Sequence, residues 1–213
     1  MRAAILVAVL LVTAVPTLAQ TDVYLGPQVS TQGIGASAEV RFGMISVSGE
    51  VGYLPVNSVT YEQNGNEFKL DVQPVSGLLL VNVFPAGRFS LGAGVLAGGL
   101  MGNGEAQNLR GLIDVGDNSY PAASVGSLTA DFEYGGVAPA VMLGLRSGGI
   151  NVGLGVAFTG TPQYTLDATG SIRNDPDFAA DLALDQSDVQ DELDNIPVLP
   201  LLRIGWQFGV FSQ

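Results

Sequence analysis

The sequence predicts an all-β fold: an eight-stranded antiparallel up-and-down transmembrane β-barrel with one short acidic amphipathic helix before the last strand. Three observations predict it. Several segments alternate bulky apolar residues with small or polar ones, and this period of two marks strands that have two different faces. Short and long connections alternate between these segments. Charged residues make up only 13% of the chain, against roughly 25% in ordinary soluble domains.

The N-terminal residues have the pattern of a secretory signal peptide. Arg2 supplies a positive charge, residues 3–15 form an apolar run, and small residues follow at the cleavage position. A spanning helix needs about 20 apolar residues, so this run is too short to remain as an anchor. We therefore expect a cleaved signal peptide at 1–19 and one barrel domain at 20–213. An uncleaved buried strand or helix is the alternative.

The strands are predicted from the alternation, which is clearest in five segments. In the last of them, Leu202, Ile204 and Trp206 share one face. Arg203 and Gly205 share the other. Glycine is costly in a helix, and β-branched residues favour strands, so a helical interpretation is weak. We expect strands near 22–31, 33–42, 44–55, 67–83, 88–101, 128–146, 149–161 and 198–211, of which 67–83, 88–101 and 128–146 are less regular.

The connections indicate which kind of barrel this is. Short turns are predicted at "RFGM", "FPAGR" and "RSGG", and long segments at 55–67, 102–127 and 162–197. Only Gln32–Gly33 is short on the long-segment side. An even number of strands with short turns at one rim and long loops at the other is the pattern of a bacterial outer-membrane barrel. Both chain ends then lie at the short-turn rim, which is expected to be periplasmic.

The composition of the two faces decides which one meets lipid. A lipocalin-like soluble barrel has the same period, with its apolar face inward. Its outer face carries many charges, whereas the polar faces here carry mostly Gly, Ser, Ala, Asn and Gln. Bulky residues outward fit hydrocarbon, and Tyr53, Trp206, Phe208 and Phe211 near strand ends fit aromatic girdles. A soluble periplasmic lipid-binding barrel remains an alternative.

Four charged residues are predicted to point into the barrel. On the expected register, Glu39, Arg41, Glu50 and Arg203 all face the lumen. Isolated buried charges are costly, so these side chains should pair with each other or with water. The interpretation is a structural ion network that fills the lumen; the alternative is a gate or narrow ion path.

Four stretches carry a resemblance to a known family. They are "SGLLLVNVFPAGRFSLGAG" at 76–94, "GTPQYTLDATG" at 160–170, "FAADLALDQSDVQDELDN" at 178–195 and "PVLPLLRIGWQFGVF" at 197–211. In these the chain resembles a poorly characterised family of small Gram-negative outer-membrane β-barrel proteins, similar to OmpA- and OmpW-like eight-stranded barrels. The resemblance implies insertion into the outer-membrane bilayer by the barrel-insertion machinery. That machinery usually reads a final, lipid-facing Phe, whereas here Ser212 and Gln213 follow Phe211, which is expected in the inward register.

The acidic stretch at 162–197 predicts the helix. Asp175 followed by Pro176 is typical of an N-cap and a first helical position. An apolar stripe then follows at helical spacing, and an acidic side opposes it. The interpretation is a helix on the barrel rim whose acids meet water. The alternative is a divalent-cation patch that bridges to lipid phosphates, since Ca²⁺ favours clustered carboxylates. Its candidate residues are Asp181, Asp185, Asp188 and Glu192.

Composition argues against other classes of function. The chain has no Cys and no His, so the usual nucleophile–base pairs and the commonest metal ligand are missing. Asp131 and Glu133 share a strand face, but a surface pair is the preferred interpretation. A net charge of −12 argues against nucleic acid. We expect a monomeric protein with a structural or surface-exposed role, without catalysis or cofactor. A narrow channel or transporter for small or apolar solutes and a loop-mediated adhesin are the alternatives.

Overall fold

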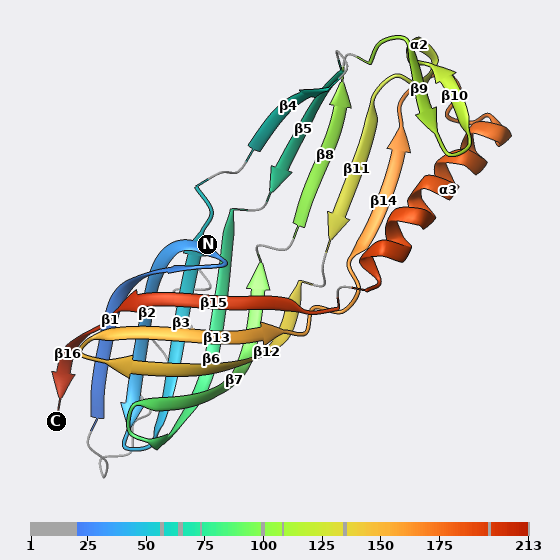
Figure 1. The fold of residues 1–213 in the computed structure, drawn as a ribbon. Helices are drawn as coiled ribbons and strands as arrows, with labels where there is room; N and C mark the ends of the chain where they lie inside the picture. Colours follow the sequence, from blue (N-terminus) through green and yellow to red (C-terminus); the bar gives the residue numbers. More distant parts are fainter. Residues whose placement is uncertain are drawn as a thin grey trace.

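The computed structural model describes residues 21–212 with a few interruptions. The interruptions are residues 56, 57, 64, 65, 73, 99, 100, 108, 134, 135 and 196. The predicted signal peptide at 1–19 lies outside the described residues. The strands form a barrel, a five-stranded sheet that extends from one of its rims, and a two-stranded hairpin at the far tip (Figure 1).

The barrel is closed and antiparallel, as predicted. Its strands run in the order β15-β13-β12-β7-β6-β3-β2-β1, and β1 closes the ring by pairing with β15. Closure gives every wall strand two hydrogen-bonded neighbours, which is why a barrel can lie in a bilayer and an open sheet cannot. The bounds are β1 Thr21–Ser30, β2 Gly33–Phe42, β3 Ile45–Tyr53, β6 Val75–Ala86, β7 Phe89–Gly98, β12 Val137–Ser147, β13 Ile150–Ala157, β15 Leu199–Trp206 and β16 Phe208–Ser212, where β16 follows β15 and pairs with β1.

The short turns fall at one rim because glycine permits them. Gly43, Gly87 and Gly148 have φ values of 60°, 62° and 57°, in the left-handed region that other residues rarely adopt. They lie between β2 and β3, between β6 and β7, and between β12 and β13. The three predicted turns are therefore present, and they join neighbouring barrel strands.

Beyond the opposite rim, the chain forms a sheet that the sequence analysis did not predict. Its order is β14-β11-β8-β5-β4. Single strands predicted at 67–83 and 128–146 are in fact two strands each, one in the extension and one in the barrel wall. The first break lies beside Pro74, which cannot donate to a ladder. The apolar face changes from even-numbered to odd-numbered residues at both breaks, and in the sequence this change appeared only as a less regular strand. The bounds are β4 Ser58–Gln63, β5 Asn66–Val72, β8 Met101–Gln107, β11 Leu128–Glu133 and β14 Gln163–Ala168.

A small apolar core holds the tip of the extension together. It is built by β9 (Leu112–Val115), β10 (Asn118–Pro121), α2 (Ala122–Val125), α3 (Pro176–Leu193) and the end of β14. Its buried residues are Val115, Val125, Ala168 and Phe178. Asp175 is the N-cap of α3, as predicted: its side chain accepts hydrogen bonds from the Asp177 and Phe178 amides at 3.0 and 3.3 Å. Among the described residues, no helix has both the length and the apolar character needed to cross a membrane.

Helix α3 covers the outer edge of β14 (Figure 1). The Gln190 side chain accepts from the Tyr164 amide at 3.0 Å and donates to the Pro162 carbonyl at 2.8 Å. The Gln186 side chain accepts from the Leu166 amide at 3.3 Å. These two glutamines, one helical turn apart, therefore take the place of a neighbouring strand and protect an edge that would otherwise be open to pairing.

The faces of the barrel strands follow the predicted alternation. Leu154 and Trp206 are 58% and 46% exposed on the outside, whereas Arg203 and Ser46 are 6% and 0% exposed inside. Small residues, among them Ala36, Ala38 and Gly77, line a hollow in the outer wall. The rest of the wall between the rims is a belt of large apolar side chains. Its members include Leu25, Val29, Ile34, Val51, Leu79, Val81, Leu91, Val95, Val141, Leu143, Val152, Leu154, Leu202 and Ile204.

The expectation that Phe211 lies in the inward register is wrong. A β-bulge shifts the pairing, so that Tyr24 lies opposite Gly209 and Val23 lies opposite Phe211. A bulge inserts one extra residue into one strand, here Val210. Phe211 therefore shares the outward face with Phe208, and both are about half exposed.

Candidate functional site: the barrel lumen

Two ion pairs cross the interior of the barrel. Glu50 on β3 pairs with Arg203 on β15, and Glu39 on β2 pairs with Arg146 on β12. Three strands separate β2 from β12 in either direction around the ring, so this pair joins opposite walls. Glu39, Glu50 and Arg203 are each no more than 6% exposed. Both pairs are inside the barrel, and each connects strands that are not neighbours in the ring.

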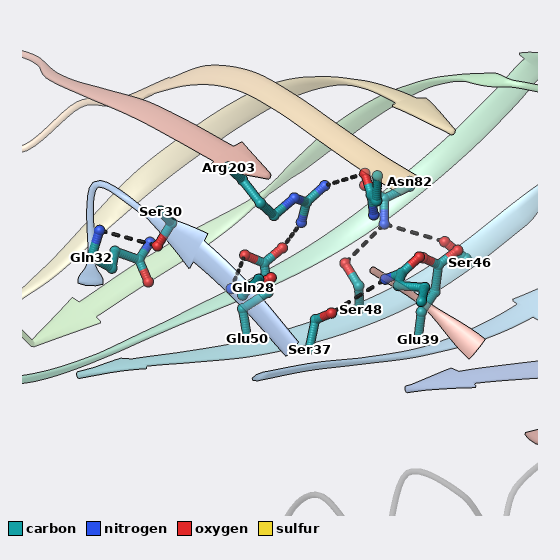
Figure 2. Close-up of polar contacts among 12 residues, drawn as sticks. Gln28, Ser30, Gln32, Ser37, Glu39, Ser46, Ser48, Glu50, Asn82 and Arg203 are labelled. Atoms are coloured by element: carbon teal, nitrogen blue, oxygen red, sulfur yellow. Dashed lines mark hydrogen bonds and ion pairs between the residues drawn. The ribbon is translucent and has the colours of Figure 1, made fainter. Parts of the chain in front are cut away.

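Polar side chains from neighbouring strands add further hydrogen bonds to this layer (Figure 2). The Gln28 amide donates to Glu50 at 3.0 Å, and Arg203 donates to the Asn151 side chain at 3.5 Å. The Asn82 amide donates to the hydroxyls of Ser46 and Ser48 at 3.2 and 3.0 Å. The predicted small polar residues therefore serve as partners for the charges as well as filling the narrow space.

Aromatic rings close the lumen towards the short-turn rim. The Arg146 guanidinium lies 4.5 Å from the ring centroid of Tyr24 and 5.5 Å from that of Phe84. Arg41 lies on Phe84 as well, at 4.0 Å. Cations over aromatic faces are attracted by the ring quadrupole. The result is a stack of two cations and two rings at this end of the barrel.

The four residues predicted to face the lumen do not form a single cluster. The structure brings Glu50 and Arg203 together. Among the described residues, no carboxylate forms an ion pair with Arg41, whose side chain donates to the Gly43 carbonyl at 2.8 Å. Glu39 pairs instead with Arg146, which the sequence analysis missed. The alternation of β12 contains the signal for this residue: Leu143 and Leu145 face outward, so Arg146 faces inward. The signal is weak in the sequence because 128–146 is one of the less regular segments.

The half of the lumen next to the extension is mostly apolar, although a buried hydrogen bond from the Ser76 hydroxyl to the Gln32 side chain, at 3.4 Å, lies at the same end. Eight inward-facing residues there are 3% exposed or less, and Phe132 at the mouth packs against them. With this layer above and the ion pairs below, side chains fill the barrel along its length. The apolar residues are Leu78, Leu80, Leu96, Ala138, Ala140, Met142, Ala157 and Leu201.

The acidic residues of α3 do not converge. Asp181 is buried, and it accepts hydrogen bonds from the Tyr120 hydroxyl and, at 2.8 Å, from the Asn118 amide. The expectation that Asp181 faces water is therefore wrong, because β10 packs over that side of the helix. Asp185 is half-buried, and Asp188 and Glu192 are exposed. In the described part of the chain, no three carboxylates lie close enough together to hold a metal ion.

The contact between Tyr120 and Asp181 should loosen at both ends of the pH scale. The hydrogen bond from Tyr120 lowers the pKa of Asp181 below 3.8, and Asp181 raises the pKa of Tyr120 to about 12. A lowered carboxyl pKa stabilises the fold at neutral pH, and this contribution is lost as the pH falls through the lowered value. A raised phenol pKa stabilises the fold below 10, and this contribution is lost as the pH rises towards 12.

The chain has no cysteine, so spin labels can be placed on cysteines introduced at Ser119 and Ser187 to measure the distance between them. We expect a narrow distance distribution at neutral pH that broadens at either extreme. In Tyr120→Phe the broadening above pH 10 should disappear. A distribution that is insensitive to pH in the unmodified background would contradict this assignment.

The candidate acid pair in the extension has a structural partner. Asp131 accepts a hydrogen bond from the Asn103 amide at 2.5 Å on the exposed sheet face. Glu133 is also exposed, two residues further along β11.

Sequence comparison finds no matching family model and no similar curated protein. Similarity appears in the fold. The solved structure of CarO2 from Acinetobacter baumannii is 16% identical over 88% of this chain and 98% of that chain, with a TM-score of 0.53. CarO from the same organism is 14% identical over 87% and 96%, with a TM-score of 0.50. Ail, the attachment invasion locus protein of Yersinia pestis, has a TM-score of only 0.30 and supports no argument. CarO is an outer-membrane eight-stranded barrel protein, and the closed barrel of this chain has that fold.

Proposed function

We propose that this chain is an integral protein of the bacterial outer membrane, with a structural or surface-exposed role and no catalysis. The apolar belt on the barrel wall carries the proposal. It covers the barrel strands on all sides, and a monomeric soluble protein rarely exposes apolar patches above a few hundred Å². Hydrocarbon is the solvent in which such a wall is stable.

The C-terminal strand supports delivery of the chain to that membrane. Trp206 at the end of β15 and Phe208 and Phe211 on β16 are all exposed aromatic residues. Because the bulge turns Phe211 outward, the strand presents an aromatic residue near its end on the lipid side. This is the feature that the barrel-insertion machinery would read.

The filled lumen favours a closed barrel over a channel. An eight-stranded barrel leaves room for little more than side chains. Here two ion pairs, an aromatic stack and an apolar layer occupy that room. We infer that the protein passes no ions through its interior, and that its role belongs to its surfaces.

Cell fractionation followed by gel migration tests the membrane assignment. We expect the protein in the outer-membrane fraction, extracted only by detergent, with faster migration before heating than after. In a planar bilayer the purified protein should give no conductance steps. Recovery as a soluble periplasmic protein would overturn the proposal, and regular conductance steps would favour the channel alternative.

The extension favours a second candidate, binding at the cell surface. All but three of the 20 acidic residues lie between 62 and 194, and all of these are in the extension and its connections. Lys69, Arg110 and Arg173 are the basic residues there. A folded, strongly acidic head fits a cationic partner.

Binding of polylysine to the protein in nanodiscs, measured at low and at high salt, tests this second function. We expect salt-sensitive binding that weakens when Asp188 and Glu192 are changed to their amides. Binding unchanged by those substitutions would argue against an electrostatic surface on α3.

A further inference from the structure

A small void lies between the two ion pairs of the lumen. Its volume is about 10 Å³, which is close to the smallest space that holds a water molecule. Side chains from β2, β6, β7, β12, β13 and β15 meet around it. Its polar lining consists of Glu39, Asn82, Ser90, Arg146, Asn151 and Arg203.

Several polar atoms on this lining are buried and have no hydrogen-bond partner among the described residues. They are one acceptor, Glu39 Oε1, and three donors, Arg203 Nε together with Nε and Nη1 of Arg146. Glu39 and Arg203 are 3% and 6% exposed. Native proteins rarely leave such groups unpaired, because the groups were hydrogen-bonded to water before folding.

We propose that this void is a binding site for one buried water molecule that bridges the two ion pairs. A water molecule can donate to Glu39 Oε1 and accept from Arg203 Nε or from Arg146. The amides of Asn82 and Asn151 and the Ser90 hydroxyl supply further partners, so the two to four hydrogen bonds of a typical buried water are available.

The charges around the void select a neutral ligand. An anion would meet the Glu39 carboxylate, and a cation would meet two guanidinium groups. Water offers both donors and acceptors and matches this mixed lining. The volume restricts the ligand to a single heavy atom.

The water joins the two ion pairs into one network. Glu39 and Arg146 connect β2 with β12, Glu50 and Arg203 connect β3 with β15, and the bridge links both across the lumen. Hydrogen-bonded groups in a medium of low dielectric strengthen one another. This inference depends on the closed barrel alone, so it would survive even if the outer-membrane assignment failed.

Nuclear magnetic resonance of the full-length protein in detergent micelles, labelled with ¹⁵N-arginine, provides the test. We expect rotating-frame cross-peaks from water to the ε-protons of Arg146 and Arg203, opposite in sign to the diagonal. That sign separates dipolar contact with a bound water from proton exchange. Arg173, which is more than half exposed, is the matched control and should show exchange only. Absence of both cross-peaks would overturn the proposal.

A variant that fills the void and a titration with an anion distinguish a water at this void from a water elsewhere and from a bound anion. Ser90→Thr adds a methyl group at the void and should abolish the cross-peaks. Ser76→Thr, at another inward serine, should keep them. Persistence of the peaks in Ser90→Thr would place the water elsewhere. Chloride added from zero to molar concentration should leave the Arg146 and Arg203 resonances unchanged; a saturable shift would identify an anion site instead.

Discussion

Arg203→Ala is expected to lower the free energy of unfolding of the barrel by about 3–5 kcal/mol. The substitution leaves the Glu50 carboxylate in the lumen without its cation. Glu50 is 4% exposed, and among the described residues the Gln28 amide is the donor that remains to it. Urea unfolding in detergent micelles, followed by Trp206 fluorescence, measures the change, and the temperature of the gel-mobility shift should fall with it.

Two control variants separate loss of the ion pair from general damage. The double substitution Glu50→Leu with Arg203→Met replaces both charges by apolar groups and should recover most of the stability, because no charge then stays unpaired. Arg173→Ala removes a pair with Asp167 whose side chains are both 56% exposed. Exposed ion pairs contribute about 0–1 kcal/mol to the free energy of unfolding, so the loss of stability in Arg173→Ala should be small. An Arg203→Ala variant as stable as Arg173→Ala would contradict a buried pair.

Leu154→Arg on the outer wall is expected to lower the free energy of unfolding in a lipid bilayer by about 2–4 kcal/mol. Leu154 lies opposite Leu143 on one neighbouring strand and Leu202 on the other, in the middle of the apolar belt. A charge at this depth leaves water for hydrocarbon, with no partner on the wall. Equilibrium unfolding of the protein in phospholipid vesicles measures the cost.

The matched control is Leu184→Arg on α3. Leu184 is 40% exposed and lies on the acidic helix outside the barrel. Surface substitutions usually change the free energy of unfolding by no more than about 0.5 kcal/mol, so Leu184→Arg should be nearly neutral. If the two substitutions prove equally mild, the barrel wall faces water and the soluble lipid-binding alternative returns.

Local patterns in the sequence predicted much of the fold. The alternation around Leu202 and Arg203 identified a strand and both of its faces, because successive side chains on a strand point to opposite sides. The three glycine turns and the Asp175 N-cap were predicted because each depends on only a few neighbouring residues. Compositional contrast between the faces was sufficient to predict an outward apolar wall.

Contacts between distant parts of the chain were not predictable in this way. Glu39 pairs with Arg146 instead of Arg41 because the stagger of strands around the ring determines which inward side chains share a level. Asp181 is buried because a hairpin more than 50 residues earlier folds onto its helix.

The sequence by itself therefore determined the barrel strands, their two faces and the short turns, since these depend on the local geometry of the backbone. Only the tertiary structure decided the partner of each buried charge, the separate extension sheet and the outward position of Phe211. The charge partners depend on the stagger of the strands around the ring. The extension sheet depends on where the barrel strands stop pairing with one another, and the position of Phe211 depends on one extra residue in a bulge. Each of them arises from the pairing of distant segments, which a periodic pattern does not encode.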